Sequence, residues 1–286
     1  MTAGTARNSP SEDERFAFGR NWESFSGKLD QERIAGARAG LEHLLQTSEL
    51  RGRTFLDIGC GSGLMSLAAH TMGAQVRAFD YDPESVRTTQ AVRDRFAGPD
   101  AYEVTEGSAL DSDFMSSLGS FEVVYSWGVL HHTGDLWAAS DLAGQAVAPG
   151  GRLAIAIYND QGMASRIWKR TKKRYIECGP TGRKALVAGV GAYFNGRKIL
   201  AQTVHAVSAL AERDASRLQS PRKERARGMD RKHDLVDWVG GYPFEVAKPE
   251  EIFDFYLQRH FRLQSLTTCA GGHGCNEFLF AKDSGA

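Results

Sequence analysis

The 286-residue chain has no long apolar run, few cysteines and no net charge. No apolar stretch approaches the roughly 18 residues of a membrane-spanning helix, which excludes a membrane-spanning class. The polar first 15 residues lack the apolar core of a secretory leader. Four cysteines in a chain of this length make no disulfide framework. These absences predict a cytoplasmic globular protein, and the 42% hydrophobic and 24% charged content agrees with one.

One stretch, residues 55–63, looks like the start of a nucleotide-binding sheet. It begins as an apolar strand that carries an acid, Asp57, and it ends in alternating glycines. Glycine allows a tight turn and a close approach of the backbone to a ligand. Apolar residues at helical spacing follow from Leu64. A phosphate-binding P-loop is excluded, because no Lys-Ser/Thr pair follows the glycines. A dinucleotide turn is disfavoured, because Leu64 stands where its third glycine belongs.

The second expected strand, Gln75–Asp80, also ends in an acid. In nucleotide-binding sheets an acid at this place accepts hydrogen bonds from the adenosine ribose hydroxyls. Asp82 and Pro83 then predict a helix start, because proline is tolerated where the first helical N–H has no partner. We therefore interpret Asp80 as a ligand contact and Asp82 as a helix cap.

The pattern Asp57-x-Gly59-x-Gly61-x-Gly63 resembles motif I of the class I S-adenosylmethionine-dependent methyltransferases. The strand 121–126, with its extension 127–135, looks like motif IV of the small-molecule members, the ubiquinone-type and natural-product group. The Pro-Gly-Gly turn at 149–151 before the fifth strand is also similar. Ser108 departs from the family pattern, which often has an acid there. The resemblance implies S-adenosylmethionine as cofactor, held by Asp57, Gly59, Cys60, Gly61, Gly63, Asp80, Tyr81, Ser108, Ala109, Ser126 and Trp127.

The alternation of helices and strands predicts an α/β fold. With the resemblance, we expect a doubly wound, mostly parallel seven-stranded sheet, a Rossmann-like methyltransferase fold with an inserted helical lid and a terminal antiparallel hairpin. The expected divisions are a disordered tail (1–15), a cofactor-binding core (16–160), a basic helical insertion (161–235) and a C-terminal part of the core with substrate-side loops (236–286).

The expected insertion is strongly basic. Residues 161–232 hold 18 Lys and Arg against 5 Asp and Glu, and their apolar periodicity predicts about three helices. Such a charge fits an anionic substrate, a membrane surface or nucleic acid, and it equally fits a solvated face that docks on an acidic core. The segment 233–245 after it is expected to be a loop.

Histidine is the side chain that titrates nearest neutral pH, so it is the natural base for an acceptor hydroxyl. The candidate bases are His131, His132, His233 and His273. The expected substrate-side residues are Tyr158, Asn159, Asp160, Trp238, Tyr242 and Glu277. No metal is expected, because Gly128 and His131 stand where related ubiquinone-pathway enzymes carry metal-binding carboxylates, and because the spacing of Cys269, His273 and Cys275 matches no standard zinc site.

Three functions remain open at this point. The first is methyl transfer to a small molecule, at a hydroxyl oxygen or else at nitrogen or carbon. The second is RNA methylation that uses the basic insertion, which the sequence Ser-Trp-Gly-Val at 126–129 disfavours, because it replaces the Asn/Asp-Pro-Pro-aromatic motif of base-nitrogen methyltransferases. The third is a non-catalytic or NAD-binding module. Nucleic acid is therefore not the expected partner, and the sequence predicts no oligomeric state.

Overall fold

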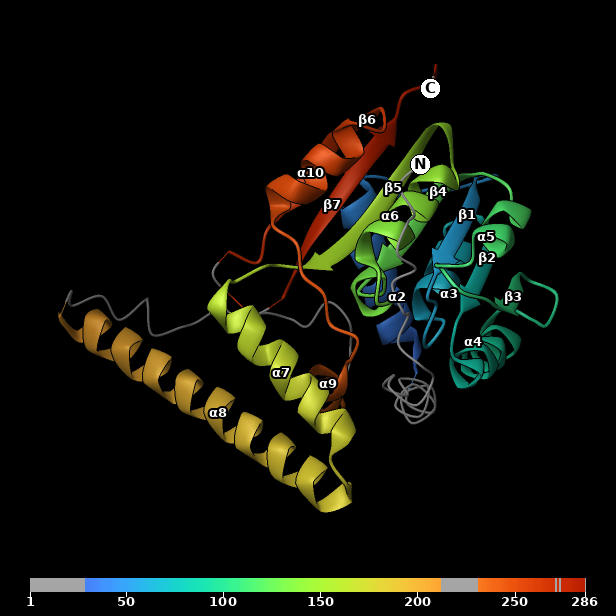
Figure 1. The fold of residues 1–286 in the computed structure, drawn as a ribbon. Helices are drawn as coiled ribbons and strands as arrows, with labels where there is room; N and C mark the ends of the chain where they lie inside the picture. Colours follow the sequence, from blue (N-terminus) through green and yellow to red (C-terminus); the bar gives the residue numbers. More distant parts are fainter. Residues whose placement is uncertain (1–28, 212–230, 271, 273, 286) are drawn as a thin grey trace, which may run out of the picture.

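The computed structural model describes residues 29–211, 231–270, 272 and 274–285, which fold around one seven-stranded sheet (Figure 1). The predicted tail, the predicted core start at residue 16 and His273 lie outside these residues. The strand order is β3-β2-β1-β4-β5-β7-β6. The strands are β1 (Thr54–Ile58), β2 (Gln75–Asp80), β3 (Glu103–Glu106), β4 (Phe121–Trp127), β5 (Val147–Tyr158), β6 (Phe261–Thr267) and β7 (Cys275–Lys282).

Strands β1 to β5 pair in parallel, whereas β7 pairs antiparallel with both β5 and β6. This arrangement confirms the predicted fold class and the terminal hairpin. The order reverses beside β1, since β2 lies on one side of it and β4 on the other. In open α/β sheets, ligands bind outside the carboxyl ends of the strands at such a reversal.

Helices cover both faces of the sheet, and each face has its own core. Phe55 belongs to one core and Leu56 to the other, because successive side chains of a strand point to opposite faces. The first core includes residues of α2 (Gln31–Leu45), α3 (Leu64–Thr71) and α4 (Pro83–Phe96). The second includes residues of α5 (Ser112–Ser117), α6 (Leu136–Gln145) and α10 (Pro249–Leu257). The near-continuous apolar strands of the sequence are thus buried on two sides.

Aspartates fix the starts of several of these helices. Asp82 accepts a hydrogen bond from the Glu84 N–H at 2.9 Å and caps α4, with Pro83 as the first helical residue. This confirms that Asp82 is a helix cap. Asp111 caps α5 and Asp135 caps α6 in the same way.

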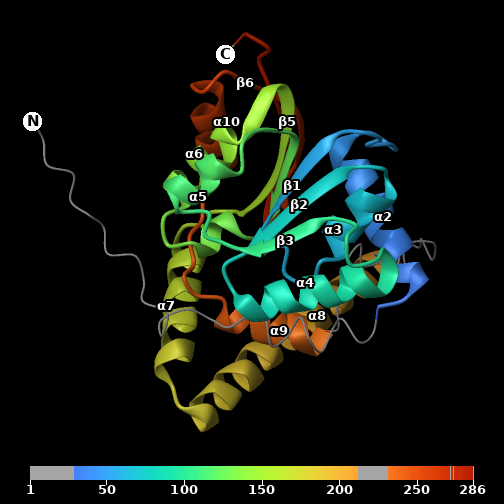
Figure 2. The same cartoon turned by 90° about the vertical axis from the view of Figure 1, so that its right-hand side faces the viewer.

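The three helices α7 (Met163–Glu177), α8 (Pro180–Ala211) and α9 (Arg231–Gly240), which we call the lid after the role predicted for the insertion, stand beyond the carboxyl end of β5 (Figures 1 and 2). They share a small apolar core of their own, with Tyr175, Val190 and Val239 buried. Residues 241–248 then run back over the sheet, where Ala247 N–H donates to the Tyr158 carbonyl at 3.0 Å.

Two predicted boundaries are wrong. Residues 233–240, expected to be a loop, belong to α9, because Val239 and its neighbours pack into the lid core and tertiary packing outweighs the loop-like composition. The turn at 149–151 is part of β5, which already pairs with β4 at Val147 and resumes at Arg152 after an irregularity in register.

Among the described helices, none has both the length and the hydropathy to cross a membrane.

Candidate active site

The glycine turn after β1 has a backbone that only glycine adopts readily. Gly59, Gly61 and Gly63 have φ angles of 78°, 54° and 75°. A Cβ on Gly59 would lie 2.5 Å from Val129, and one on Gly63 would lie 2.9 Å from the Thr89 backbone. Thr89 also donates its hydroxyl to the Gly61 carbonyl at 3.1 Å. The turn is therefore held in one shape and leaves no room for a side chain at Gly59 or Gly63.

Asp80, at the end of β2, is fixed against this turn. Its carboxylate accepts the Gly61 N–H at 2.9 Å and the Asp82 N–H at 3.0 Å. Burial raises the pKa of Asp80 to about 6, although both backbone hydrogen bonds act to lower it. Each carboxylate oxygen can accept a further hydrogen bond, so Asp80 can still take one from a ligand hydroxyl.

Asp57 is a buried acid, 1% exposed, behind the turn. It accepts the Ser66 hydroxyl at 2.5 Å. Burial raises its pKa to about 7, with the Asp80 charge acting in the same direction and the Ser66 hydrogen bond against it. Asp57 therefore connects the strand to helix α3 and does not line the pocket described next.

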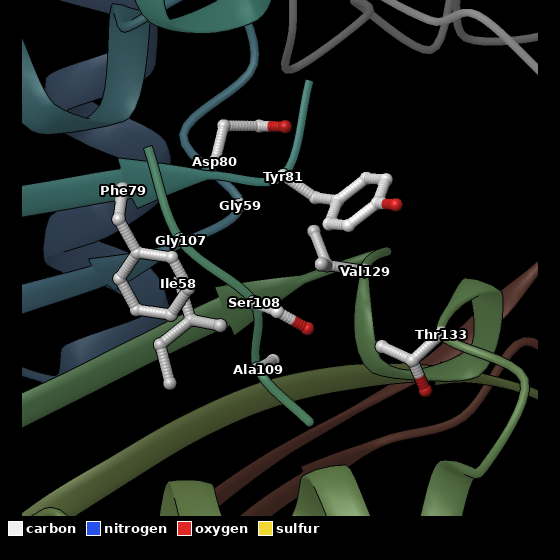
Figure 3. Close-up of a pocket in the computed structure, with 10 residues that line it drawn as sticks. All are labelled: Ile58, Gly59, Phe79, Asp80, Tyr81, Gly107, Ser108, Ala109, Val129 and Thr133. Carbon is white, nitrogen blue, oxygen red and sulfur yellow. The ribbon is translucent and has the colours of Figure 1, made fainter. Parts of the chain in front are cut away.

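A pocket opens beside Asp80 at the carboxyl ends of β1 to β4 (Figure 3). Its polar lining residues are Asp80, Tyr81, Ser108 and Thr133, and its apolar wall includes Phe79 and Ala109. An acid for a ribose, apolar walls for a base and a glycine turn that a Cβ would fill are what a nucleoside needs. The lining residues are Ile58, Gly59, Phe79, Asp80, Tyr81, Gly107, Ser108, Ala109, Val129 and Thr133.

The pocket thus contains Gly59, Asp80, Tyr81, Ser108 and Ala109 of the predicted cofactor residues, and the other predicted cofactor residues are not among those that line it. Cys60 is buried and accepts the Thr89 hydroxyl. Ser126 donates to the Ile58 carbonyl at 3.2 Å, and the Trp127 indole donates to Glu277 at 2.8 Å. Glu277, predicted on the substrate side, is therefore the partner of Trp127.

The turn after β4 connects this pocket to a second group of residues. Val129 and Thr133 line the pocket, and between them the short helix η2 (Leu130–His132) carries both histidines. The His131 ring lies 4.5 Å from the His132 ring and 4.0 Å from the Tyr158 ring, centroid to centroid. His131 and His132, which follow β4, therefore lie together with Tyr158 at the end of β5, next to the pocket.

Hydrogen bonds define the protonation of both rings. The Tyr158 N–H donates to Nδ1 of His131 at 3.3 Å, so a neutral His131 carries its proton on Nε2. Nδ1 of His132 lies 2.6 Å from the Pro243 carbonyl, which can only accept, so His132 carries its proton on Nδ1.

Burial lowers the pKa of His131 well below its ordinary value, with the charges of His132 and Lys172 acting in the same direction. Burial and the Lys172 charge lower the pKa of His132 to about 3, against the hydrogen bond to Pro243. Both histidines are therefore neutral at pH 7.

Lys172 is the main residue that the sequence reasoning missed. It lies on α7 and is 0% exposed. Its ammonium donates to the Trp238 carbonyl and lies 4.6 Å from the Trp238 ring centroid, 4.9 Å from that of Phe244 and 5.8 Å from that of Tyr158. A signal was present in the sequence, because Ser165, Trp168, Lys172 and Tyr175 follow the helical spacing of a buried face.

Other predicted substrate-side residues are engaged in structural contacts. Asn159 accepts the Asn276 amide at 3.1 Å, and Asp160 accepts the Gly162 N–H at 2.8 Å. Tyr242 is half-buried and precedes Pro243. His233 lies on α9. No cluster of potential metal ligands occurs within the described part of the chain.

Comparison with known proteins shows what the part of the chain around this site resembles. Residues 56–155 match a family model described as a methyltransferase domain. The chain is 32% identical over 119 residues to the ubiquinone biosynthesis O-methyltransferase of Xanthomonas euvesicatoria, covering 42% of this chain and 48% of that protein. Residues 56–155 are therefore similar to the methyltransferase domain of S-adenosylmethionine-dependent enzymes. It spans about half the length of the curated relatives that it matches.

Solved methyltransferases share the fold of this domain. The magnesium protoporphyrin IX methyltransferase of Synechocystis, solved with bound SAH, has a TM-score of 0.53 at 14% identity, covering 92% of this chain and 94% of that one. An O-methyltransferase family protein of Burkholderia thailandensis has a TM-score of 0.56 at 12% identity, covering 96% and 66%. S-adenosylmethionine is the cofactor of this family, and the pocket at Asp80 fits its nucleoside.

The buried acid of the methyltransferase domain gives a prediction for stability. The pKa of Asp57 in the folded state lies above its ordinary value of 3.8, so the folded state binds this proton more tightly. The contribution of Asp57 to the free energy of unfolding is fully present below about pH 4 and is lost as the pH rises through about 7. Above about pH 7, Asp57→Asn should therefore have a larger free energy of unfolding than the parent, by roughly 1 to 3 kcal/mol. The difference spans a range because Asp80 titrates together with Asp57, so the pKa shift belongs to the pair.

Urea unfolding of the parent and Asp57→Asn at several pH values measures this difference. Glu84→Gln, at a half-buried acid of α4, is the control for a general charge effect. A difference between the parent and Asp57→Asn that does not grow between pH 4 and pH 8 would contradict the assignment.

Proposed function

We propose that the protein is an S-adenosylmethionine-dependent methyltransferase that acts on a hydroxyl oxygen of a small molecule. The observation that carries the proposal is the turn 129–133, which lines the nucleoside pocket with Val129 and Thr133 and also carries His131 and His132. A group bound against these histidines would lie next to a cofactor in the pocket. The similarity to O-methyltransferases supports oxygen as the acceptor atom.

The chain itself would supply binding and orientation. Asp80 would accept hydrogen bonds from the ribose hydroxyls, and the glycine turn would let the backbone approach the rest of the cofactor. S-adenosylmethionine, when bound, supplies an electrophilic methyl group. The lid and residues 241–248 would close the acceptor side from water.

The two histidines would then have different roles. In neutral His131 the Nδ1 lone pair is used by the Tyr158 N–H, so its ring acts as a donor through Nε2. The basic position of His132 is Nε2, since Nδ1 carries the proton. A pKa of about 3 makes His132 a weak base, because general-base efficiency is best when the pKa lies near the working pH.

Methyl transfer from labelled S-adenosylmethionine tests the proposal directly. The full chain is incubated with separate pools of phenols, carboxylic acids, amines and total RNA, and products are identified by mass and by the position of the label. Transfer to a hydroxyl oxygen is the expected result. Transfer only to RNA, or only to nitrogen or carbon, would replace the proposed acceptor, and a chain that binds no cofactor would contradict the activity.

The lid gives a prediction that proteolysis can measure. Exposed basic residues such as Lys169 and Arg170 lie on α7, and trypsin can cleave there only when the helix opens. S-adenosylhomocysteine together with an accepted substrate, each at about 100 times its Kd, should slow this cleavage by up to roughly 100-fold for each of the two ligands that binds only the closed lid. Cleavage at Arg51, at the opposite end of the sheet and with its side chain 86% exposed, is the control and should not change. Equal protection at both places would argue for general stabilisation instead of lid closure.

A further inference from the structure

A positive charge is buried where the lid meets the end of the sheet. Lys172 projects from α7 and is 0% exposed, and its ammonium is surrounded by rings from three places: Tyr158 at the end of β5, Trp238 on α9 and Phe244 in the segment after α9. Lysine is among the residues least often fully buried, because desolvation of its charge is unfavourable. A lysine at this position therefore calls for a functional explanation.

A buried hydrogen-bond donor lies close to this charge. His131 is 0% exposed, and its Nε2 has no hydrogen-bond partner among the described residues. The Tyr158 N–H on Nδ1 places the proton of the neutral ring on this Nε2. The Tyr158 ring contacts both groups, at 4.0 Å from the His131 ring and 5.8 Å from the Lys172 ammonium. A buried N–H without an acceptor is unfavourable, and a bound acceptor atom would remove that penalty.

We propose that Lys172 and His131 form an anion site that binds the reacting oxygen of the acceptor in its ionised form. This inference rests on the proposed methyltransferase function and deepens it. Lys172 supplies the charge, and the Nε2–H of His131 supplies a hydrogen bond from the turn that adjoins the cofactor pocket. The acceptor is then a molecule whose reacting hydroxyl is acidic enough to ionise beside a lysine.

The size of the expected pKa shift decides how the acceptor hydroxyl loses its proton. It can ionise because a positive charge is near, or a basic side chain can remove the proton. An opposite charge within about 4–6 Å lowers a pKa by roughly 1 to 3 units. That shift brings a hydroxyl with a pKa near 10, such as a tyrosine-like phenol, toward neutral pH, whereas it leaves an aliphatic alcohol protonated. His132 is too weakly basic to take the proton from such an alcohol.

The overall reaction balances without a protein base. The acceptor oxygen gives its proton to water when it binds. Its new bond to the methyl carbon then replaces the bond between that carbon and the cofactor sulfur. The product is a neutral ether, and no residue of the chain retains a proton.

The ionisation of a bound chromophore tests the anion site without turnover. 4-Nitrophenol is titrated spectrophotometrically in the presence of the full chain and saturating S-adenosylhomocysteine. The parent should lower the pKa of the bound probe by about 1 to 2 units. Lys172→Met should abolish most of this shift, and Lys173→Met, which removes an exposed charge from the same helix, should keep it.

The controls separate this inference from the proposed function. Calorimetry with S-adenosylhomocysteine shows that each variant is folded at the cofactor site, and Lys172→Gln replaces Lys172→Met if the methionine variant misfolds. A parent that binds S-adenosylhomocysteine but does not bind nitrophenol, or leaves its pKa unchanged, overturns the anion site alone. An equal pKa shift in Lys172→Met and the parent does the same. A parent that binds no S-adenosylhomocysteine overturns the proposed function as well.

Discussion

Asp80→Asn is expected to weaken the binding of S-adenosylmethionine by roughly 10- to 150-fold, the equivalent of about 1.5 to 3 kcal/mol for hydrogen bonds to a charged group. The carboxylate lines the pocket and is oriented by the N–H groups of Gly61 and Asp82. Asparagine has almost the same shape but offers one acceptor oxygen and no charge. Asp80→Ala should bind at least as weakly, since it also leaves the Gly61 N–H without its acceptor.

The affinity of the parent should depend on pH in the direction set by Asp80. Its pKa is about 6 in the free protein, and the ionised form is the better acceptor for ribose hydroxyls. Binding should therefore tighten as the pH rises through about 6 and level off above it, while Asp80→Asn should lack this change.

Isothermal titration of the parent and the variant between pH 5 and pH 8 measures both effects. Asp82→Asn is the matched control, because asparagine caps a helix as well as aspartate does and Asp82 is outside the pocket. An unchanged affinity of Asp80→Asn for S-adenosylmethionine would contradict the assignment of Asp80 as the residue that binds the ribose hydroxyls.

Much of the cofactor half could be predicted from sequence because its signals are local. The strand Gln75–Asp80 and the cap at Asp82 agree with the structure, since an apolar run that ends in an acid and an Asp-Pro pair each act over a few residues. The glycine turn is equally local, because the positive φ angles at Gly59, Gly61 and Gly63 favour glycine over other residues.

The proposed acceptor site around His131 and Lys172 could be predicted only in part, because its contacts join residues that are distant in sequence. His131, Tyr158 and Trp238 were candidates as residues at strand ends or in a polar segment, but their meeting at Lys172 depends on how the lid packs. The basic composition of 161–232 also concealed Lys172 among exposed charges. Helical spacing separates it from them, because it shares the buried face of α7 with Trp168 and Tyr175.

The pocket residues that were not predicted have a similar explanation. Val129 and Thr133 enter the pocket because the turn after β4 bends back beside Gly59, where a Cβ on the glycine would meet Val129. Composition gives no sign of such a contact between two loops. Pairing of β1 with β4 in the sheet brings the loops together.

Gly63→Ala should destabilise the fold by roughly 2 to 5 kcal/mol, and comparison with Gly52→Ala should show why. Both glycines have a left-handed backbone, with φ angles of 75° and 71°. That conformation costs a residue with a Cβ about 1 to 2 kcal/mol. A Cβ on Gly52 meets nothing within 4 Å, whereas one on Gly63 lies 2.8 Å from the Thr89 side chain and 2.9 Å from its backbone.

The added overlap at Gly63 should contribute a further 1 to 3 kcal/mol or so, because the Thr89 backbone belongs to α4 and cannot yield as a flexible side chain does. Urea unfolding of the two variants measures the difference. Gly63→Ala should also weaken S-adenosylhomocysteine binding, because relief of the clash moves the turn that Thr89 holds at Gly61. Equal destabilisation in the two variants would mean that backbone strain alone selects glycine at position 63, and that the close packing of the turn on α4 adds nothing to it.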